Sequence, residues 1–308
     1  MKLYLIRPRG FCAGVVRAIN IVEKALKLYG APIYIKHEIV HNKHVVNSLK
    51  EKGAIFVEDL NEIPMGSKVI YSAHGISPQI RNEAKKRNLI EIDATCGLVT
   101  KIHSAVKRYA SKGYKIILIG KKKHVEIIGI YNEAPSVTTI IENTKDIDLL
   151  NFKKEEKLFF ITQTTLSTDD VIDIKKSLLN KYPNIETLPT SSICYATTNR
   201  QNALKEITNN VDLVLVIGDP TSSNSNRLKE VAIKRNKMAY LVNSKDEIDP
   251  KWFEGINSIA MTAGASTPEN IVQSCIEKLY DFGLKEIEEI IYKKEDVIFE
   301  LPTQLLNV

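Results

Sequence analysis

The chain has 308 residues, of which 44% are hydrophobic and 26% charged, and its 43 Lys and Arg against 37 Asp and Glu give a net charge of +6. This composition is typical of a globular protein with two or three units of ordinary size. No apolar run approaches the roughly 18 residues that a membrane span needs. The basic residues are spread out, without an arginine-rich tract or an aromatic RNA-binding pattern. We therefore expect neither a membrane nor a nucleic acid as partner, and an anionic small substrate explains the charge equally well.

Four cysteines, at positions 12, 96, 194 and 275, are too sparse and too scattered for a disulfide framework. The opening letters MKLYLIRPRG read as a first strand and not as a signal or transit segment. We expect a soluble, reducing compartment, either a bacterial cytoplasm or, for a processed chain, the stroma of a plastid.

Three cysteines each open a similar segment. The segments are CAGVVRAINIVEKAL from Cys12, CGLVTKIHSAVKRYA from Cys96 and CYATTNRQNALKEI from Cys194. Apolar residues recur in them at helical spacing. Each cysteine is therefore predicted to lie at or just before a helix N-terminus, where free N–H groups and the helix dipole favour an anionic thiolate.

Two short apolar runs follow each of these helices. Continuous apolar runs are typical of strands that are covered on both faces of a sheet. The first runs are APIYIKHEIVH, YKIILIG and VDLVLVIG, and the second are SKVIYSAHG, KLFFITQTT and INSIAMTAGAS. The alternation predicts an α/β fold of three units with mostly parallel sheets. The predicted units are residues 1–95, 96–193 and 194–283, with a C-terminal tail, 284–308, that packs back on the first.

Polar residues stand just beyond each of these strands. The first polar position comes 28 or 29 residues after the cysteine in every segment, and the second follows further on; together they are His41, His124, Ser222, His74, Thr164 and Ser266. Ligands of open α/β sheets bind beyond the carboxyl ends of the strands. A trefoil with a pseudo-threefold axis would therefore bring three thiolates and six polar residues to one centre.

Three thiolates from three units can bind zinc or an iron–sulfur cluster, or can simply be buried. Structural zinc normally takes four ligands at short spacing, which is absent here, and a [4Fe–4S] cluster normally takes four thiolates. Cys275 lies in the amphipathic stretch ENIVQSCIEKLY and is predicted to be a core residue. A three-thiolate cluster leaves one iron without a protein ligand, free to act as a Lewis acid. The spacing alone leaves a cluster and inert thiols equally open.

Eight short motifs along the chain allow a more specific interpretation. They are PRGFCAGVVRAI, EIVHN, SAHGIS, DATCGLVTK, TQTTLS, ICYATTNRQ, SSNSNRL and TAGAST. In this order they resemble the LytB family, the 4-hydroxy-3-methylbut-2-enyl diphosphate reductases, over nearly the whole chain. The resemblance implies a trefoil around a central iron–sulfur cluster. It also implies reductive removal of the allylic hydroxyl of the substrate, which gives isopentenyl and dimethylallyl diphosphate in the last step of the non-mevalonate isoprenoid pathway.

The resemblance also assigns roles to residues. Cys12, Cys96 and Cys194 correspond to the ligands of a [4Fe–4S] cluster, which becomes [3Fe–4S] if its open iron is lost, and the substrate hydroxyl binds at that iron. Glu126 corresponds to the proton donor and Thr164 to a hydroxyl that relays or orients the proton. His124 corresponds to a residue on the alkyl and proton-transfer side of the substrate. The residues that correspond to the diphosphate pocket are His41, His74, Ser222, Ser223, Asn224 and Ser266. An electron-donor protein of the ferredoxin or flavodoxin type is implied as partner.

One position departs from the family pattern, and three histidines fall outside it. Proline usually separates the paired His and Glu of the family, whereas this chain has Val125, which does not fix φ as proline does; we expect the chemistry to survive the change. His37, His44 and His103 match no motif and are expected at the surface or on helix faces. The alternatives are a hydro-lyase of the aconitase type, a quinolinate-synthase-like trefoil, or an iron–sulfur sensor that binds nucleic acid.

Overall fold

The computed structural model describes residues 1–306, which form two compact units. The first unit comprises residues 1–15, 41–45 and 195–298, and the second comprises the remaining described residues. The last two residues of the predicted C-terminal tail, 307 and 308, lie outside the described part. The division of the sequence into three units and their pseudo-threefold arrangement stay predictions.

The first unit is built on a five-stranded sheet in the order β10-β9-β11-β1-β12, in which every pairing is parallel. Its strands are β1 (Lys2–Arg7), β9 (Leu213–Ile217), β10 (Met238–Val242), β11 (Ser258–Ala263) and β12 (Glu286–Ile291). The central strands β9 and β11 are almost wholly buried, which explains their continuous apolar sequences. The first strand of the chain therefore lies between β11 and β12, which come from its last third.

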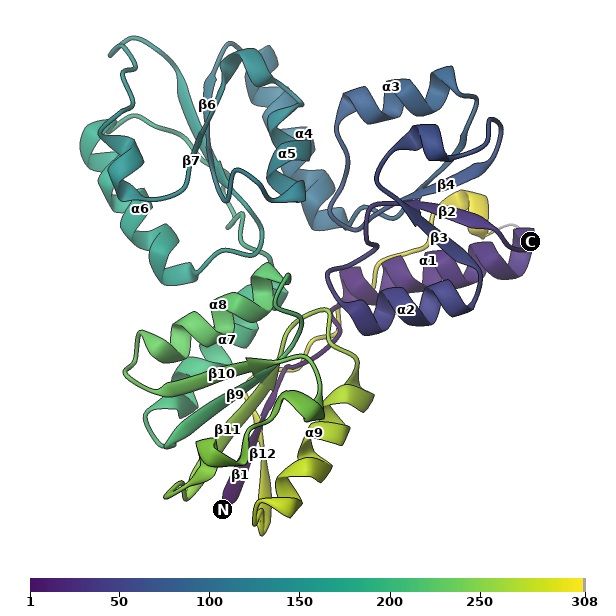
Figure 1. Ribbon diagram of the computed structural model, residues 1–308. Coiled ribbons are helices and arrows are strands. Elements are labelled where there is room, and N and C mark those ends of the chain that lie inside the picture. Colours follow the sequence, from purple (N-terminus) through teal and green to yellow (C-terminus); the bar gives the residue numbers. More distant parts are fainter. Residues whose placement is uncertain (307–308) are drawn as a thin grey trace. The chain divides into compact units, whose positions relative to one another are not determined.

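Helices cover both faces of this sheet (Figure 1). They are α7 (Tyr195–Thr208) and α8 (Ser223–Ile233) on one face and α9 (Glu269–Asp281) on the other. Alternate residues of β9 face opposite sides: Leu215 packs in the core with α9, and Val214 in the core with α7 and α8. Cys275 of α9 is fully buried, as the amphipathic pattern predicts.

The second unit carries two separate parallel sheets. The larger has the strand order β3-β2-β4-β5, from β2 (Ile33–Lys36), β3 (Ala54–Val57), β4 (Lys68–Tyr71) and β5 (Ile90–Asp93). Helix α3 lies on one face, and α1 and α2 lie on the other (Figure 1). These helices are α1 (Ala13–Tyr29), α2 (Lys43–Glu51) and α3 (Pro78–Lys86), and the first few residues of α1 and α2 belong to the first unit.

The smaller sheet has the order β7-β6-β8, from β6 (Lys115–Ile119), β7 (Thr138–Ile141) and β8 (Leu158–Thr162). Helices α4 (Gly97–Ser111) and α5 (Val125–Tyr131) share a core with one face of this sheet, and α6 (Thr168–Lys181) shares a core with the other. The predicted α/β class with parallel sheets is therefore confirmed, since the three sheets found within residues 1–306 are parallel and carry helices on both faces.

The remaining regular elements are short 3-10 turns. They are Leu60–Glu62, Pro135–Val137, Thr144–Ile147, Lys245–Glu247, Pro250–Phe253 and Thr303–Leu305. The last turn is held on α1, because Tyr29 donates its hydroxyl proton to the Gln304 carbonyl and Arg17 donates to the Glu300 carbonyl. Within residues 1–306, no helix combines the length and the apolar character needed to cross a membrane.

Candidate active site

The three cysteines of the repeated segments share one local geometry. Cys12 immediately precedes α1, Cys96 is the N-cap of α4, and Cys194 immediately precedes α7. All three are half-buried, whereas Cys275 is inaccessible. The prediction that each thiol lies at a helix N-terminus is confirmed, and burial raises the pKa of the Cys275 thiol to about 12.

Each of these cysteines is also fastened to the end of a strand. The N–H of Cys12 donates to the Ala265 carbonyl (3.1 Å), that of Cys96 to Ala73 (3.0 Å) and that of Cys194 to Thr164 (3.0 Å). The three acceptors follow β11, β4 and β8 by two residues each. The repeat in the sequence is therefore a repeat in hydrogen bonding, and it fixes each thiol beside a polar strand end.

The predicted polar residues all lie beyond carboxyl ends of strands. Each of the first set follows its strand by five residues, and these are His41 after β2, His124 after β6 and Ser222 after β9. Each of the second set follows its strand by two or three residues, and these are His74 after β4, Thr164 after β8 and Ser266 after β11. This placement agrees with the rule for ligand sites of parallel sheets.

A buried carboxyl bonded to Thr164 is the main feature of the second unit. Glu126, in the first turn of α5, is 2% exposed. Its Oε1 accepts the N–H of Thr164 at 2.7 Å, and its Oε2 lies 2.8 Å from the Thr164 hydroxyl. Burial raises the pKa of Glu126 to about 7, although the two hydrogen bonds from Thr164 oppose the shift. The carboxyl is therefore suited to hold and release a proton near neutral pH.

Two predicted histidines lie near the start of α5. One is bonded to Glu126, and the other contacts the first. His124 caps α5 with Nδ1, which accepts the N–H of Glu126 at 3.2 Å. The ring of His74 lies edge-on to that of His124, with centroids 6.0 Å apart, and its Nδ1 lies 3.3 Å from the Ser72 hydroxyl. Val125 is the first residue of α5, a position at which proline is favourable but not required. The helix begins normally without it.

The predicted phosphate-binding residues of the first unit form one hydrogen-bonded group. Asn224 is 4% exposed; its amide donates to the Thr197 hydroxyl (3.1 Å) and its Oδ1 accepts the N–H of Ala265 (2.9 Å). Ser266 donates its hydroxyl proton to the His41 carbonyl (2.9 Å). The first turn of α8 and the segment that carries His41 are therefore both held to the loop after β11, to which the N–H of Cys12 is also bonded.

Helix α8 begins within this group. Ser222 is its N-cap and accepts the N–H of Ser225 at 3.4 Å, and Ser223 is its first residue. An α-helix N-terminus presents unpaired N–H groups and the positive end of the dipole, which suits an anion. Polar hydroxyl and amide groups at such a terminus form a chemically suitable cradle for phosphate oxygens.

Two residues that the sequence analysis missed support this group. Thr197 holds the amide of Asn224. Asp219 is inaccessible; it accepts the N–H of Lys43 at 3.0 Å and the N–H of Thr221 at 2.9 Å, and so fixes the segment that carries His41. Despite burial, these hydrogen bonds hold the pKa of Asp219 below its usual range. Asp219 stands directly between β9 and the SSNSN motif, and a polar residue at a strand end was the available signal.

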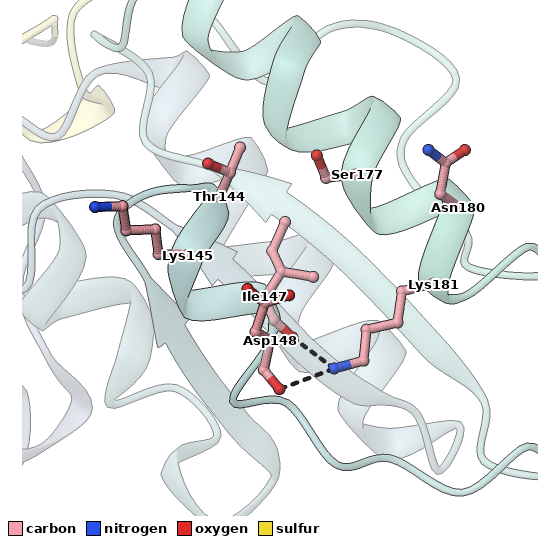
Figure 2. Close-up of a pocket in the computed structure, with 7 residues that line it drawn as sticks. All are labelled: Thr144, Lys145, Ile147, Asp148, Ser177, Asn180 and Lys181. Carbon is pink, nitrogen blue, oxygen red and sulfur yellow. Dashed lines mark hydrogen bonds between the residues drawn. The ribbon is translucent and has the colours of Figure 1, made fainter.

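The structure also contains a cavity that none of the predicted residues lines. It measures about 510 Å³ in the second unit, between α6 and the Thr144–Ile147 turn (Figure 2). Lys181 is committed there to structure, since its Nζ donates to the carbonyls of Ile147 (2.8 Å), Asp148 (3.1 Å) and Leu150 (2.8 Å). This cavity therefore holds none of the candidate site residues.

Residues 3–280 match the family model described as LytB protein. The chain belongs to the LytB family. The 4-hydroxy-3-methylbut-2-enyl diphosphate reductase of Protochlamydia amoebophila is 64% identical over all of this chain and 98% of the relative. The reductase of the same name from Chlamydia pneumoniae is 60% identical, over 99% of this chain and 98% of its own.

Two solved structures of LytB-type reductases are similar to this one. The E-1-hydroxy-2-methyl-but-2-enyl-4-diphosphate reductase of Plasmodium falciparum has a TM-score of 0.97 at 52% identity, and the match covers 99% of this chain and 96% of that one. A second structure is described as (E)-4-hydroxy-3-methyl-but-2-enyl diphosphate reductase, the terminal enzyme of the non-mevalonate pathway. It has a TM-score of 0.65 at 30% identity, covering 91% of this chain and 99% of that one.

Proposed function

We propose that this LytB protein is a 4-hydroxy-3-methylbut-2-enyl diphosphate reductase. The reaction cleaves the allylic C–O bond, consumes two electrons and two protons, and yields isopentenyl and dimethylallyl diphosphate with one water. It would be the last step of the non-mevalonate pathway. The observation that carries the proposal is the buried Glu126–Thr164 pair, because a reductive dehydroxylation needs a protonated acid that can turn the leaving hydroxyl into water.

We propose a [4Fe–4S] cluster with Cys12, Cys96 and Cys194 as its ligands. The donor set fits, because three half-buried thiols stand at helix N-termini, where thiolates are favoured, and the fourth cysteine is sealed in a core. When bound, such a cluster supplies electrons and an iron without a protein ligand that acts as a Lewis acid.

The Glu126–Thr164 pair can move a proton without moving the backbone. When the carboxyl is protonated, its O–H can donate to the Thr164 hydroxyl, which then turns its own proton away from Glu126. The N–H of Thr164 stays bonded to the other carboxyl oxygen and holds the pair in register. We propose Glu126 as the proton source, Thr164 as the relay and His124, which caps the same helix, as a further catalytic and substrate-binding residue.

The diphosphate is proposed to bind at the strand-end residues. Ser222, Ser223 and Asn224 would offer hydroxyl, amide and backbone donors at the N-terminus of α8. His41, His74 and Ser266 would add imidazole and hydroxyl donors. An external one-electron carrier, of the ferredoxin or flavodoxin type, is proposed as redox partner, and a reducing compartment, bacterial cytoplasm or plastid stroma, as location.

The function is tested by turnover with anaerobically purified protein. We expect brown protein that consumes the hydroxylated diphosphate only when a one-electron donor is added, with both products detected by mass spectrometry. A hydro-lyase would need no reductant, and a nucleic-acid sensor would show salt-dependent binding to DNA or RNA. Fully reconstituted protein that turns over no substrate would refute the proposal.

A pH limb is expected in the steady-state rate. Glu126 must be protonated to act as an acid, and its pKa is raised to about 7. The kcat/KM should therefore be level below this pKa and fall about tenfold per pH unit above it. A pH series on wild-type protein measures the limb, and a profile that rises through neutral pH would mean that an ionised group is required instead.

Replacement of Asn224 by Asp should weaken substrate binding. A carboxylate adds negative charge to a site proposed to hold diphosphate, and it can no longer donate to the Thr197 hydroxyl. We expect KM to rise about 10- to 100-fold, equivalent to about 1.4–2.7 kcal/mol, with a smaller change in kcat. Asn236→Asp, which adds the same charge beyond the C-terminal end of α8, is the control. Equal KM values for the two variants would contradict the phosphate role.

A further inference from the structure

His103 lies where three segments of the second unit meet, and together with Glu133 it is called the wedge below. It lies on α4, the helix that Cys96 begins, and is 8% exposed, so the helix face it occupies is buried rather than at the surface. Its Nδ1 lies 2.7 Å from Oε1 of Glu133, a residue that follows α5. Because a carboxylate only accepts hydrogen bonds, this contact places the proton of the imidazole on Nδ1 and orients the ring.

Two glycines let other elements approach the ring closely. A Cβ at Gly129 of α5 would stand 3.3 Å from Cε1 of His103 and 3.5 Å from the Ile76 carbonyl carbon. A Cβ at Gly75, the residue after His74, would stand 2.9 Å from Nε2 of His103, and Gly75 has a φ of +80°. Both glycines therefore face the Cε1–Nε2 edge of the ring, and neither position has room for a Cβ unless the imidazole or the backbone shifts.

Burial of this ring and of its carboxylate partner carries a free-energy cost, because polar groups lose their hydrogen bonds to water. Nε2 of His103 has no hydrogen-bond partner among the residues described. The Glu133 side chain is 5% exposed and also pairs with Lys107 at 3.1 Å. An apolar side chain would fill the same space without burying an ion pair or an unsatisfied nitrogen. Retention of a rigid, hydrogen-bonded ring at this point favours a positioning role.

The two segments that approach His103 carry residues of the proposed site. Helix α5 has His124 as its N-cap and Glu126 in its first turn, three residues before Gly129, and the Gly75 turn carries His74. We propose that the His103–Glu133 pair is a positioning element, which sets the separation between the helix that carries the proton donor Glu126 and the turn that carries His74. This inference rests on the proposed role of Glu126, and it makes His103 a positioning residue and not a catalytic one.

The test uses three variants and one control in the cluster-loaded enzyme. Gly129→Ala pushes α5 away from the ring, His103→Phe keeps the ring volume but removes the bond to Glu133, and Glu133→Gln keeps an acceptor for Nδ1. Val106→Ala is the control, because Val106 is also buried on α4 but is not part of the His103–Glu133 pair. Melting temperature and iron content are recorded for all four.

Two readouts separate positioning from mere stability. Gly129→Ala and His103→Phe should lower kcat about tenfold or more while KM changes less than threefold, since small displacements of catalytic groups are costly. They should also lower the titration midpoint of Glu126, followed by the infrared carboxyl band that disappears in Glu126→Gln, because water reaches a displaced carboxyl. Glu133→Gln should stay near wild type, and Val106→Ala should change only the melting temperature.

The outcomes distinguish this inference from the proposed function. If Gly129→Ala and His103→Phe behave like Val106→Ala, the wedge is only structural and the inference is wrong. If wild-type protein has no turnover, the proposed function fails, but the Glu126 midpoint still tests the wedge. Should His103→Phe not fold, Gly129→Ala against Val106→Ala decides the matter.

Discussion

Glu126→Gln is expected to abolish most turnover while the fold and the iron content stay intact. The amide oxygen can accept the Thr164 N–H, and the amide nitrogen can donate to the Thr164 hydroxyl, so both contacts survive. What the amide lacks is a proton that it can release. A positioned acid contributes about 10²–10⁴-fold to a rate, and we expect kcat to fall by that factor. Near-normal kcat would mean that the proton comes from another group.

The same variant should change how stability depends on pH. The pKa of Glu126 is about 7 when folded, against 4.5 for an unperturbed glutamate, so the folded chain binds more protons between these values. Wild-type stability should therefore fall as pH rises from 4.5 to 7, by about 3 kcal/mol in the contribution of this group. Glu126→Gln lacks that loss. Chemical denaturation of both proteins at pH 5 and pH 8 measures this effect. If the unfolding free energies of variant and wild type differ by the same amount at both pH values, the folded carboxyl does not bind a proton in this range.

Local sequence patterns were sufficient to place the proposed site residues at helix N-termini and strand ends. The three cysteines lie at helix N-termini because helical periodicity starts directly after each of them. The strand ends were readable because apolar runs stop just before polar clusters, and the core position of Cys275 followed from its amphipathic helix. These features depend on residues a few positions apart, and such features are visible in one sequence.

Strand partners were not readable in the same way. Strand β1 pairs with β11 and β12, more than 250 residues later in the chain. Parallel strands buried on both faces have similar apolar sequences, so periodicity does not show which ones pair. The strands at the sheet edges, such as β3 and β7, are short and only partly buried, and their weaker patterns were not singled out.

His103 shows a second limit of local reasoning. Its position on a helix face was expected, but its burial depends on Gly75 and Gly129, which are distant in the sequence and admit other backbones close to the ring. A glycine inside a short helix, as at Gly129, was the available signal, because glycine is unfavourable there unless space demands it. The Glu126–Thr164 pair, by contrast, was expected from the family resemblance, and the structure gives its distances and burial.

Replacement of single cysteines by serine should divide the four residues into two classes. Cys12→Ser, Cys96→Ser and Cys194→Ser should each lose most of the iron and at least 10³-fold of the turnover, since a neutral hydroxyl replaces a thiolate ligand. Cys275→Ser should keep its iron and activity, at a cost of about 1–3 kcal/mol in stability for burying a hydroxyl in an apolar core. Iron and sulfide analysis with parallel thermal unfolding measures both effects.

Serine is a stringent substitution here because it preserves the local fold. Cys96 is the N-cap of α4 and makes no side-chain cap hydrogen bond, whereas serine is among the preferred N-caps. Helix α4 should therefore be at least as stable in Cys96→Ser, and circular dichroism of the metal-free variants should match that of metal-free wild type. Loss of iron with unchanged helix content can then be attributed to the missing thiolate. A Cys12, Cys96 or Cys194 variant with full iron content, or a Cys275 variant without iron, would overturn the ligand assignment.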